Sequence, residues 1–142
     1  MWRIFNNLLL FILASISISS GAQETEDWVM LGSGARNDAN MHGYGYYSPR
    51  SVKKLAKGEY VVLMLTDIDE NPITIHGATV RSLISDVYLK CETRRASPAS
   101  MVLKSGRMGS GKVLERKTLV NLVFKKPVPG SPLEVLFSRV CK

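Results

Sequence analysis

The sequence predicts an α+β domain in which an antiparallel β-sheet of about five or six strands carries a C-terminal helix packed on one face. Three observations lead to this fold: short apolar segments separated by turn residues, one helical period at the C-terminal end, and two cysteines placed for a single disulfide. The disulfide would pin the helix to the sheet.

The first 22 residues have the pattern of a signal peptide. Arg3 supplies a positive charge, residues 8–18 form an apolar run shorter than a membrane span, and small residues end the segment at Ala22. We predict cleavage after Ala22, which leaves residues 23–142 as one exported domain. An uncleaved N-terminal anchor is the alternative. No cysteine stands near the predicted cut to accept a lipid.

Turn residues divide the exported part into strands. The unbroken apolar run at 60–65 is typical of a central strand covered on both faces. A loop is expected at 32–45 and a turn at 67–72. The other expected strands are 28–31, 44–47, an extended segment at 78–92, and a hairpin of 101–104 with 112–117 around a glycine-rich connection.

The C-terminal segment has the signature of a helix start, with Ser131 as N-cap, proline at the first helical position and Glu134 three residues after the cap. Its apolar positions form one stripe, made of Leu133, Leu136, Phe137, Val140 and Cys141. Strand alternation with Val87 and Leu89 places Cys91 on the buried face of its strand. These two cysteines are the only ones in the chain, so an oxidising compartment predicts a Cys91–Cys141 bridge. Closing a loop of about fifty residues would stabilise the fold by about 4 kcal/mol.

Several of these segments together resemble the surface-adhesin protein E family of bacterial exported domains. The similarity lies in Trp28-Val29 and in residues 46–52, 87–94, 105–111 and 127–134, followed by a closing Val140-Cys141. The resemblance implies an antiparallel sheet with a C-terminal helix, and binding of host matrix and plasma proteins. It supplies no catalytic residue. The namesake carries a lipid anchor, for which this chain has no accepting cysteine.

Other chemistry finds little support in the sequence. Residues 106–112 nearly match a phosphate-binding loop, but Val113 stands where a hydroxyl should hold magnesium, and a strand rather than a helix follows. His42 and His76 fall in separate loop regions, with Asp38 and Asp67 loosely nearby, and lack the spacing of zinc ligands. We therefore predict no catalytic residue, no metal site, no nucleotide and no cofactor, and we do not expect an enzyme.

A net charge of +7 favours an anionic partner. If the hairpin folds as expected, basic residues around it and at the end of the Cys91 strand could form one positive surface. The candidate ligand-binding residues are Arg94, Arg95, Lys104, Arg107, Lys112, Arg116 and Lys117. The alternative is that these are solvated charges that keep a sheet edge from pairing with neighbours.

Together these patterns predict an exported, non-enzymatic binding domain that contacts host matrix or plasma proteins, or anionic glycans, through a basic sheet surface. The alternative is a periplasmic accessory or structural component of an envelope assembly. We expect no transmembrane segment in the mature chain, and an exposed sheet edge allows a homodimer. The expected location is the periplasm or the outer surface or exterior of a Gram-negative bacterium.

Overall fold

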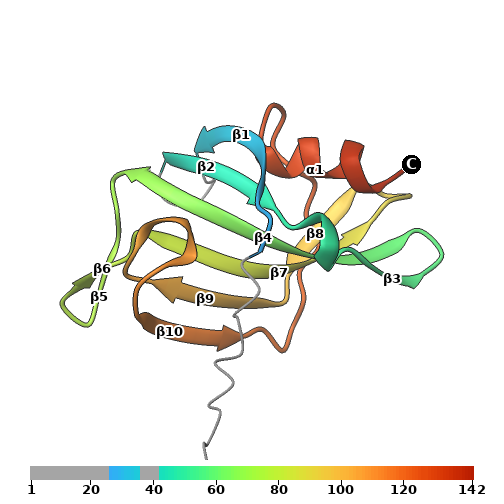
Figure 1. Ribbon diagram of the computed structural model, residues 1–142. Helices are drawn as coiled ribbons and strands as arrows, with labels where there is room; N and C mark the ends of the chain where they lie inside the picture. Colours follow the sequence, from blue (N-terminus) through green and yellow to red (C-terminus); the bar gives the residue numbers. More distant parts are fainter. Residues whose placement is uncertain (1–25, 36–41) are drawn as a thin grey trace, which may run out of the picture.

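The computed structural model describes residues 26–35 and 42–142 (Figure 1). The predicted signal peptide and its cleavage site after Ala22 lie outside the described residues. Among the residues described, no helix has the length and apolar character needed to cross a membrane.

Within the described residues, six antiparallel strands follow one another in the order β1-β2-β4-β7-β9-β10. Their bounds are Val29–Ala35, His42–Tyr47, Glu59–Glu70, Ser82–Lys90, Ser100–Lys104 and Val113–Thr118. The predicted sheet is thus confirmed. The sequence did not reveal two short additions, β3 (Lys53–Ala56) beside β4 and β8 (Arg95–Pro98) beside β7, nor the separate hairpin of β5 (Thr74–Ile75) and β6 (Ala78–Thr79).

The long strands β4 and β7 form the centre of the sheet and give it two distinct ends. They pair from Glu59 opposite Lys90 to Asp67 opposite Ser82. At the first end, which we call the disulfide end, β3 lies beside β4 and β8 beside β7. At the other, the loop end, β2 lies beside β4 and β9 beside β7. At about 3.3 Å per residue, the length of β7 separates these ends by about 26 Å.

Two expected connections are shorter than the sequence indicated. Most of the predicted loop at 32–45 is strand, because β1 continues to Ala35 and β2 begins at His42. The predicted turn at 67–72 is also largely strand, since β4 runs to Glu70 and only Asn71 has a positive φ. Glycine and aspartate usually mark turns. In this fold they lie in paired strands, where they contact other parts of the molecule.

The glycines of β1 and β2 make room for the C-terminal helix. A Cβ atom on Gly45 would lie 2.4 Å from Cβ of Pro132, and one on Gly34 would lie 3.2 Å from its Cδ. Figure 1 shows helix α1 (Pro132–Val140) lying against β1 and β2 near the C-terminus. The absence of side chains at these two strand positions therefore allows the close approach of the first helical turn.

The helix begins as predicted and covers one face of the sheet. Oγ of Ser131 accepts a hydrogen bond from the backbone N–H of Glu134. Leu136 and Phe137 are fully buried and pack with Val62, Val87 and Leu89 of the central strands. A second apolar cluster at the loop end contains Ile68, Val80, Leu83 and Leu103.

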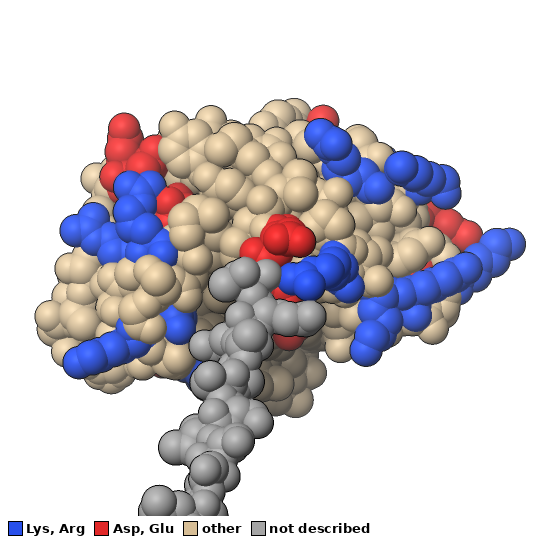
Figure 2. Space-filling view, in the orientation of Figure 1, with Lys and Arg blue, Asp and Glu red and all other residues tan. Residues whose placement is uncertain are grey.

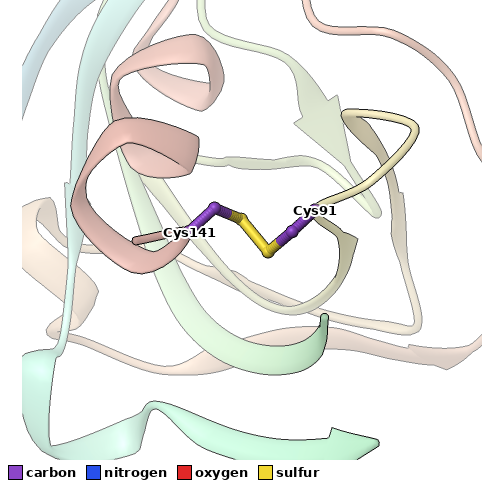
Figure 3. Close-up of a disulfide and its surroundings, with 2 residues drawn as sticks. All are labelled: Cys91 and Cys141. Carbon is purple, nitrogen blue, oxygen red and sulfur yellow. A yellow bond between two sulfur atoms is a disulfide. The ribbon is translucent and has the colours of Figure 1, made fainter. Parts of the chain in front are cut away.

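The predicted disulfide between Cys91 and Cys141 is present (Figure 3). Its sulfur atoms are 2.03 Å apart and join residues separated by 50 positions. Cys91 lies in the turn directly after β7 rather than within the strand, and Cys141 caps the C-terminal end of α1. The bridge therefore connects the end of the helix to the turn that ends β7.

Candidate functional site

The glycine-rich connection between β9 and β10 folds back over β4 and β7 at the loop end (Figure 1). Asp67, which is only 3% exposed, holds it there. One carboxylate oxygen of Asp67 accepts hydrogen bonds from Nε and Nη2 of Arg107, at 3.0 and 2.6 Å. The other accepts from the backbone N–H of Met108 at 2.7 Å. The hydrogen bond to Asp67 also raises the pKa of Arg107, which keeps the guanidinium charged.

Ser82, directly opposite Asp67 on β7, forms a second attachment for this connection. The hydroxyl of Ser82 donates to the carbonyl oxygen of Gly106 at 2.6 Å and accepts from the N–H of Gly109 at 2.9 Å. The amides of Met108 and Gly109 thus point to side chains of the sheet. In a phosphate-binding loop such amides face the ligand, so the connection acts as a structural clamp in this fold.

The structure does not bring the seven basic candidates together on one surface. Lys104, Arg107 and Lys112 lie at the loop end, because Lys104 is opposite Ser82 and Val113 is opposite Lys104. Arg94 and Arg95 lie at the disulfide end, where Arg95 is opposite Lys90. Arg116 and Lys117 lie on β10, and Nζ of Lys117 is 3.9 Å from Oε1 of Glu115.

At the disulfide end, Arg94 and Arg95 have basic neighbours that sequence order conceals. The N–H of Cys91 donates to the carbonyl oxygen of Gly58 at 2.8 Å, which places the β3–β4 turn beside the β7–β8 turn. The disulfide holds Cys141 at the β7–β8 turn, which places the next residue, Lys142, at this end of the sheet as well. We define the basic end as these six exposed residues: Lys53, Lys54, Lys57, Arg94, Arg95 and Lys142.

The cations of the basic end are not neutralised by carboxylates of the described residues, although two of them contact other groups. None of the six makes an ion pair with another residue in the described ranges. The guanidinium of Arg94 lies 5.2 Å from the ring centre of Phe137, and Nη1 of Arg95 donates to the carbonyl oxygen of Phe124 at 3.4 Å. Figure 2 shows Lys and Arg side chains gathered toward both ends of the visible face, one group over the β3 end.

The two histidines differ in their surroundings. His42 lies in β2 rather than in a loop, and its Nδ1 is 2.8 Å from Oδ1 of Asp69. His76 is exposed in the β5–β6 turn. Asp38 lies outside the described residues. Over residues 26–35 and 42–142, no group of three or more His, Cys, Asp or Glu is placed to hold a metal ion.

Comparison with known proteins gives both a family and a fold. A family model described as surface-adhesin protein E matches residues 28–142. Among solved structures, crystal form II of Haemophilus influenzae protein E superposes with a TM-score of 0.54 at 12% identity, covering 68% of this chain and 79% of that chain.

Protein E from non-typeable Haemophilus influenzae gives a TM-score of 0.54 at 12% identity, covering 84% of this chain and 78% of that chain. At this identity the structural likeness shows the fold alone. A comparison with curated proteins found no match.

Proposed function

The chain belongs to the surface-adhesin protein E family, and we propose that it is an exported, non-enzymatic domain that binds an anionic glycan through its basic end. The observation that carries this proposal is the grouping of six exposed cations without ion-pair partners among the described residues. Their attraction for a polyanion is long-ranged and weakens as salt is added.

Two features make the basic end suited to an extended ligand. Its lysines come from the β3–β4 segment, whereas Arg94 and Arg95 come from the β7–β8 turn, so the charges are spread over neighbouring elements. The Gly58–Cys91 hydrogen bond joins these two elements, and the disulfide joins the β7–β8 turn to the end of α1. A row of sulfate or carboxylate groups would therefore meet several cations at once without first ordering the chain.

Heparin binding tests the proposal directly. The variant Lys53→Ala/Lys54→Ala/Lys57→Ala removes three cations of the basic end, and Lys112→Ala/Arg116→Ala/Lys117→Ala removes three elsewhere as a matched control. At about 0.5 kcal/mol for each exposed contact, the first variant should lose about tenfold in affinity. The control should change much less, and the affinity of the wild type should fall as sodium chloride is raised.

Equal losses in the two triple variants would mean that net charge alone attracts heparin, and the basic end would then have no special role. No binding to heparin, combined with binding to immobilised matrix or plasma proteins, would replace the glycan by a protein partner. That second result would still agree with a binding domain of this family.

We also propose that residues 1–22 are removed and that residues 23–142 reach the cell surface. The family match over residues 28–142 supports a single domain after the signal peptide. Protease treatment of intact cells, with antibody detection of the mature protein and a periplasmic protein as control, tests the location. Digestion would support surface display, whereas protection until the outer membrane is opened would favour a periplasmic accessory role.

A further inference from the structure

A cleft of about 440 Å³ lies on the helix-covered face of the sheet. Met64 of β4 and Leu83 and Val87 of β7 form its apolar floor, Val123 lies on one wall and Leu133 of α1 on the other. This volume falls within the range of about 300–1,000 Å³ that is usual for small-molecule sites.

The walls of the cleft are fixed by backbone contacts. The segment after β10 is attached where the N–H of Leu119 donates to the carbonyl oxygen of Ala99 at 2.8 Å. Further along, Ala96 and Lys125 exchange two hydrogen bonds of 2.9 Å. On the other side, Pro132 is seated against the glycines of β1 and β2. The cleft is therefore preformed, which reduces the entropy that a ligand must overcome.

Two polar side chains of the cleft floor, Thr66 and Ser85, make no side-chain hydrogen bond among the described residues. Ser85 is 5% exposed and makes no side-chain hydrogen bond to any residue that the structure describes. It lies on the same face of β7 as Leu83 and Val87, and all three line the cleft. Because the described residues contain no buried side-chain polar atom without a partner, the Ser85 hydroxyl is open to the cleft, where a polar atom of a ligand can take the place of solvent.

The charges that line the cleft within the described ranges have one sign. Among these residues, only Lys125 and Lys126 are charged, and both are exposed. The backbone of Lys125 pairs with Ala96, which fixes the Cα atom of Lys125 beside the cleft. An anionic group would meet two cations and no carboxylate among the lining residues.

We propose that this cleft binds a small carboxylate with a largely apolar body. The body lies over Met64, Leu83 and Val87, a polar atom reaches the Ser85 hydroxyl, and the carboxylate lies near Lys125 and Lys126. Apolar burial supplies most of the affinity, and the lysines select the sign of the charged group. The site shares no residue with the basic end, but Arg95 adjoins Ala96 of its wall, so dodecanoate binding is measured separately from heparin binding.

Dodecanoate, used below its micelle concentration, is a suitable probe because it joins a twelve-carbon chain to one carboxylate. Titration of the ¹⁵N-labelled protein should give saturable amide shifts centred on Ser85, Val87 and Lys125. Dodecyltrimethylammonium, with the same chain and the opposite charge, should bind at least about tenfold more weakly. Equal binding of the two probes, shifts that do not saturate, or shifts centred elsewhere would overturn the proposal.

Two variants locate the binding in the cleft. Lys125→Glu/Lys126→Glu should weaken dodecanoate binding by about tenfold, since it reverses both charges at exposed positions. Lys112→Glu/Arg116→Glu makes the same change in charge outside the cleft and should leave the affinity unchanged. Ser85→Leu should abolish binding by filling the floor. If that variant does not fold, the lysine pair and its control still decide the outcome, and equal affinities in those two would overturn the proposal.

Discussion

Asp67 is the residue on which the arrangement of the loop end depends. It lies in the middle of a sheet, almost without exposure, and its two carboxylate oxygens together accept three hydrogen bonds from the glycine-rich connection. A buried carboxylate is costly unless it is paired and hydrogen-bonded, and Arg107 and the Met108 amide supply both conditions. The same contacts hold the guanidinium of Arg107 against the sheet, which distinguishes it from the unpaired cations of the basic end.

Replacing Asp67 with Ala should lower the free energy of unfolding by about 2–3 kcal/mol, because it leaves the partners of a charged acceptor unsatisfied. Urea denaturation measures the loss, and hydrogen exchange at Met108 and Gly109 should accelerate. Asp86 is a matched control, since it is exposed on the same sheet face and accepts a single side-chain hydrogen bond from Ser100. Asp86→Ala should cost less than about 0.5 kcal/mol. Similar losses in both variants would contradict the clamp.

The pair of His42 and Asp69 gives the stability a pH dependence. Their hydrogen bond raises the pKa of His42 above 6.5 and lowers the pKa of Asp69 below 3.8. The contribution of His42 is complete below pH 6.5 and is lost as the pH rises through its folded pKa. The contribution of Asp69 is complete above pH 3.8 and is lost as the pH falls through its folded pKa. The pair therefore stabilises the fold most between these two values.

Urea denaturation of the wild type and His42→Gln between pH 5.5 and 8 tests this coupling. The difference in stability between the two proteins should shrink as the pH rises, because neutral His42 gains less from Asp69 than the imidazolium does. Asp69→Asn should remove the same dependence and lower the pKa of His42 in an NMR titration. A difference that stays constant across this range would show that the pair does not titrate as described.

At the scale of elements, the sequence predicted those features that depend on local pattern. The helix start at Ser131, the hairpin of β9 and β10 and the central strand β4 follow from capping, turn chemistry and apolar runs. The strand character of residues 32–35 and 42–43 was missed because glycine normally marks a loop. Here Gly34 and Gly45 serve the docking of Pro132, and no local signal in the sequence reports a contact with a helix so distant in the chain.

The seven basic residues that were predicted to form one surface lie apart for a related reason. Grouping Arg94 and Arg95 with the hairpin residues required the hairpin to lie at the same end of β7 as Cys91, but β9 pairs with the opposite end of that strand. The β3–β4 turn reaches the disulfide end through the register of β4 against β7. Strand register depends on pairing across the sheet, which a single sequence does not specify.

The contact between β2 and the first turn of α1 can be tested by adding one methyl group. Gly45→Ala would place a Cβ atom 2.4 Å from Cβ of Pro132 and should destabilise the protein by about 1–3 kcal/mol. Ser33→Ala, at an exposed position on β1, is the control. In a Pro132→Gly background, Gly45→Ala should cost at least about 1 kcal/mol less, since both ring carbons that it approaches, Cβ and Cγ, are then absent. Equal costs in both backgrounds would place the strain elsewhere.

Over the whole molecule, the two ends of the sheet are stabilised by different means. At the loop end, polar contacts from Asp67 and Ser82 hold the β9–β10 connection over one face. At the disulfide end, a covalent bond joins the end of the helix to the turn after β7 (Figure 3). The proposed carboxylate cleft lies on the helix-covered face, with walls that depend on the seating of α1. Loss of the disulfide should therefore affect the stability of the whole domain.

Replacing both cysteines, as Cys91→Ser/Cys141→Ser, should lower the free energy of unfolding by about 4 kcal/mol, because the unfolded chain regains the entropy of an open loop. Guanidinium denaturation of the oxidised wild type, the reduced wild type and the double variant provides the measurement. The chain has only these two cysteines, so the reduced protein and the variant should agree. A loss below about 1 kcal/mol would show that helix packing alone, through Leu136 and Phe137, holds the C-terminal segment in place. If the loss is as large as expected, reduction should also release Lys142, which follows Cys141, from its fixed position and weaken heparin binding, which would connect the stability of the domain to its proposed function.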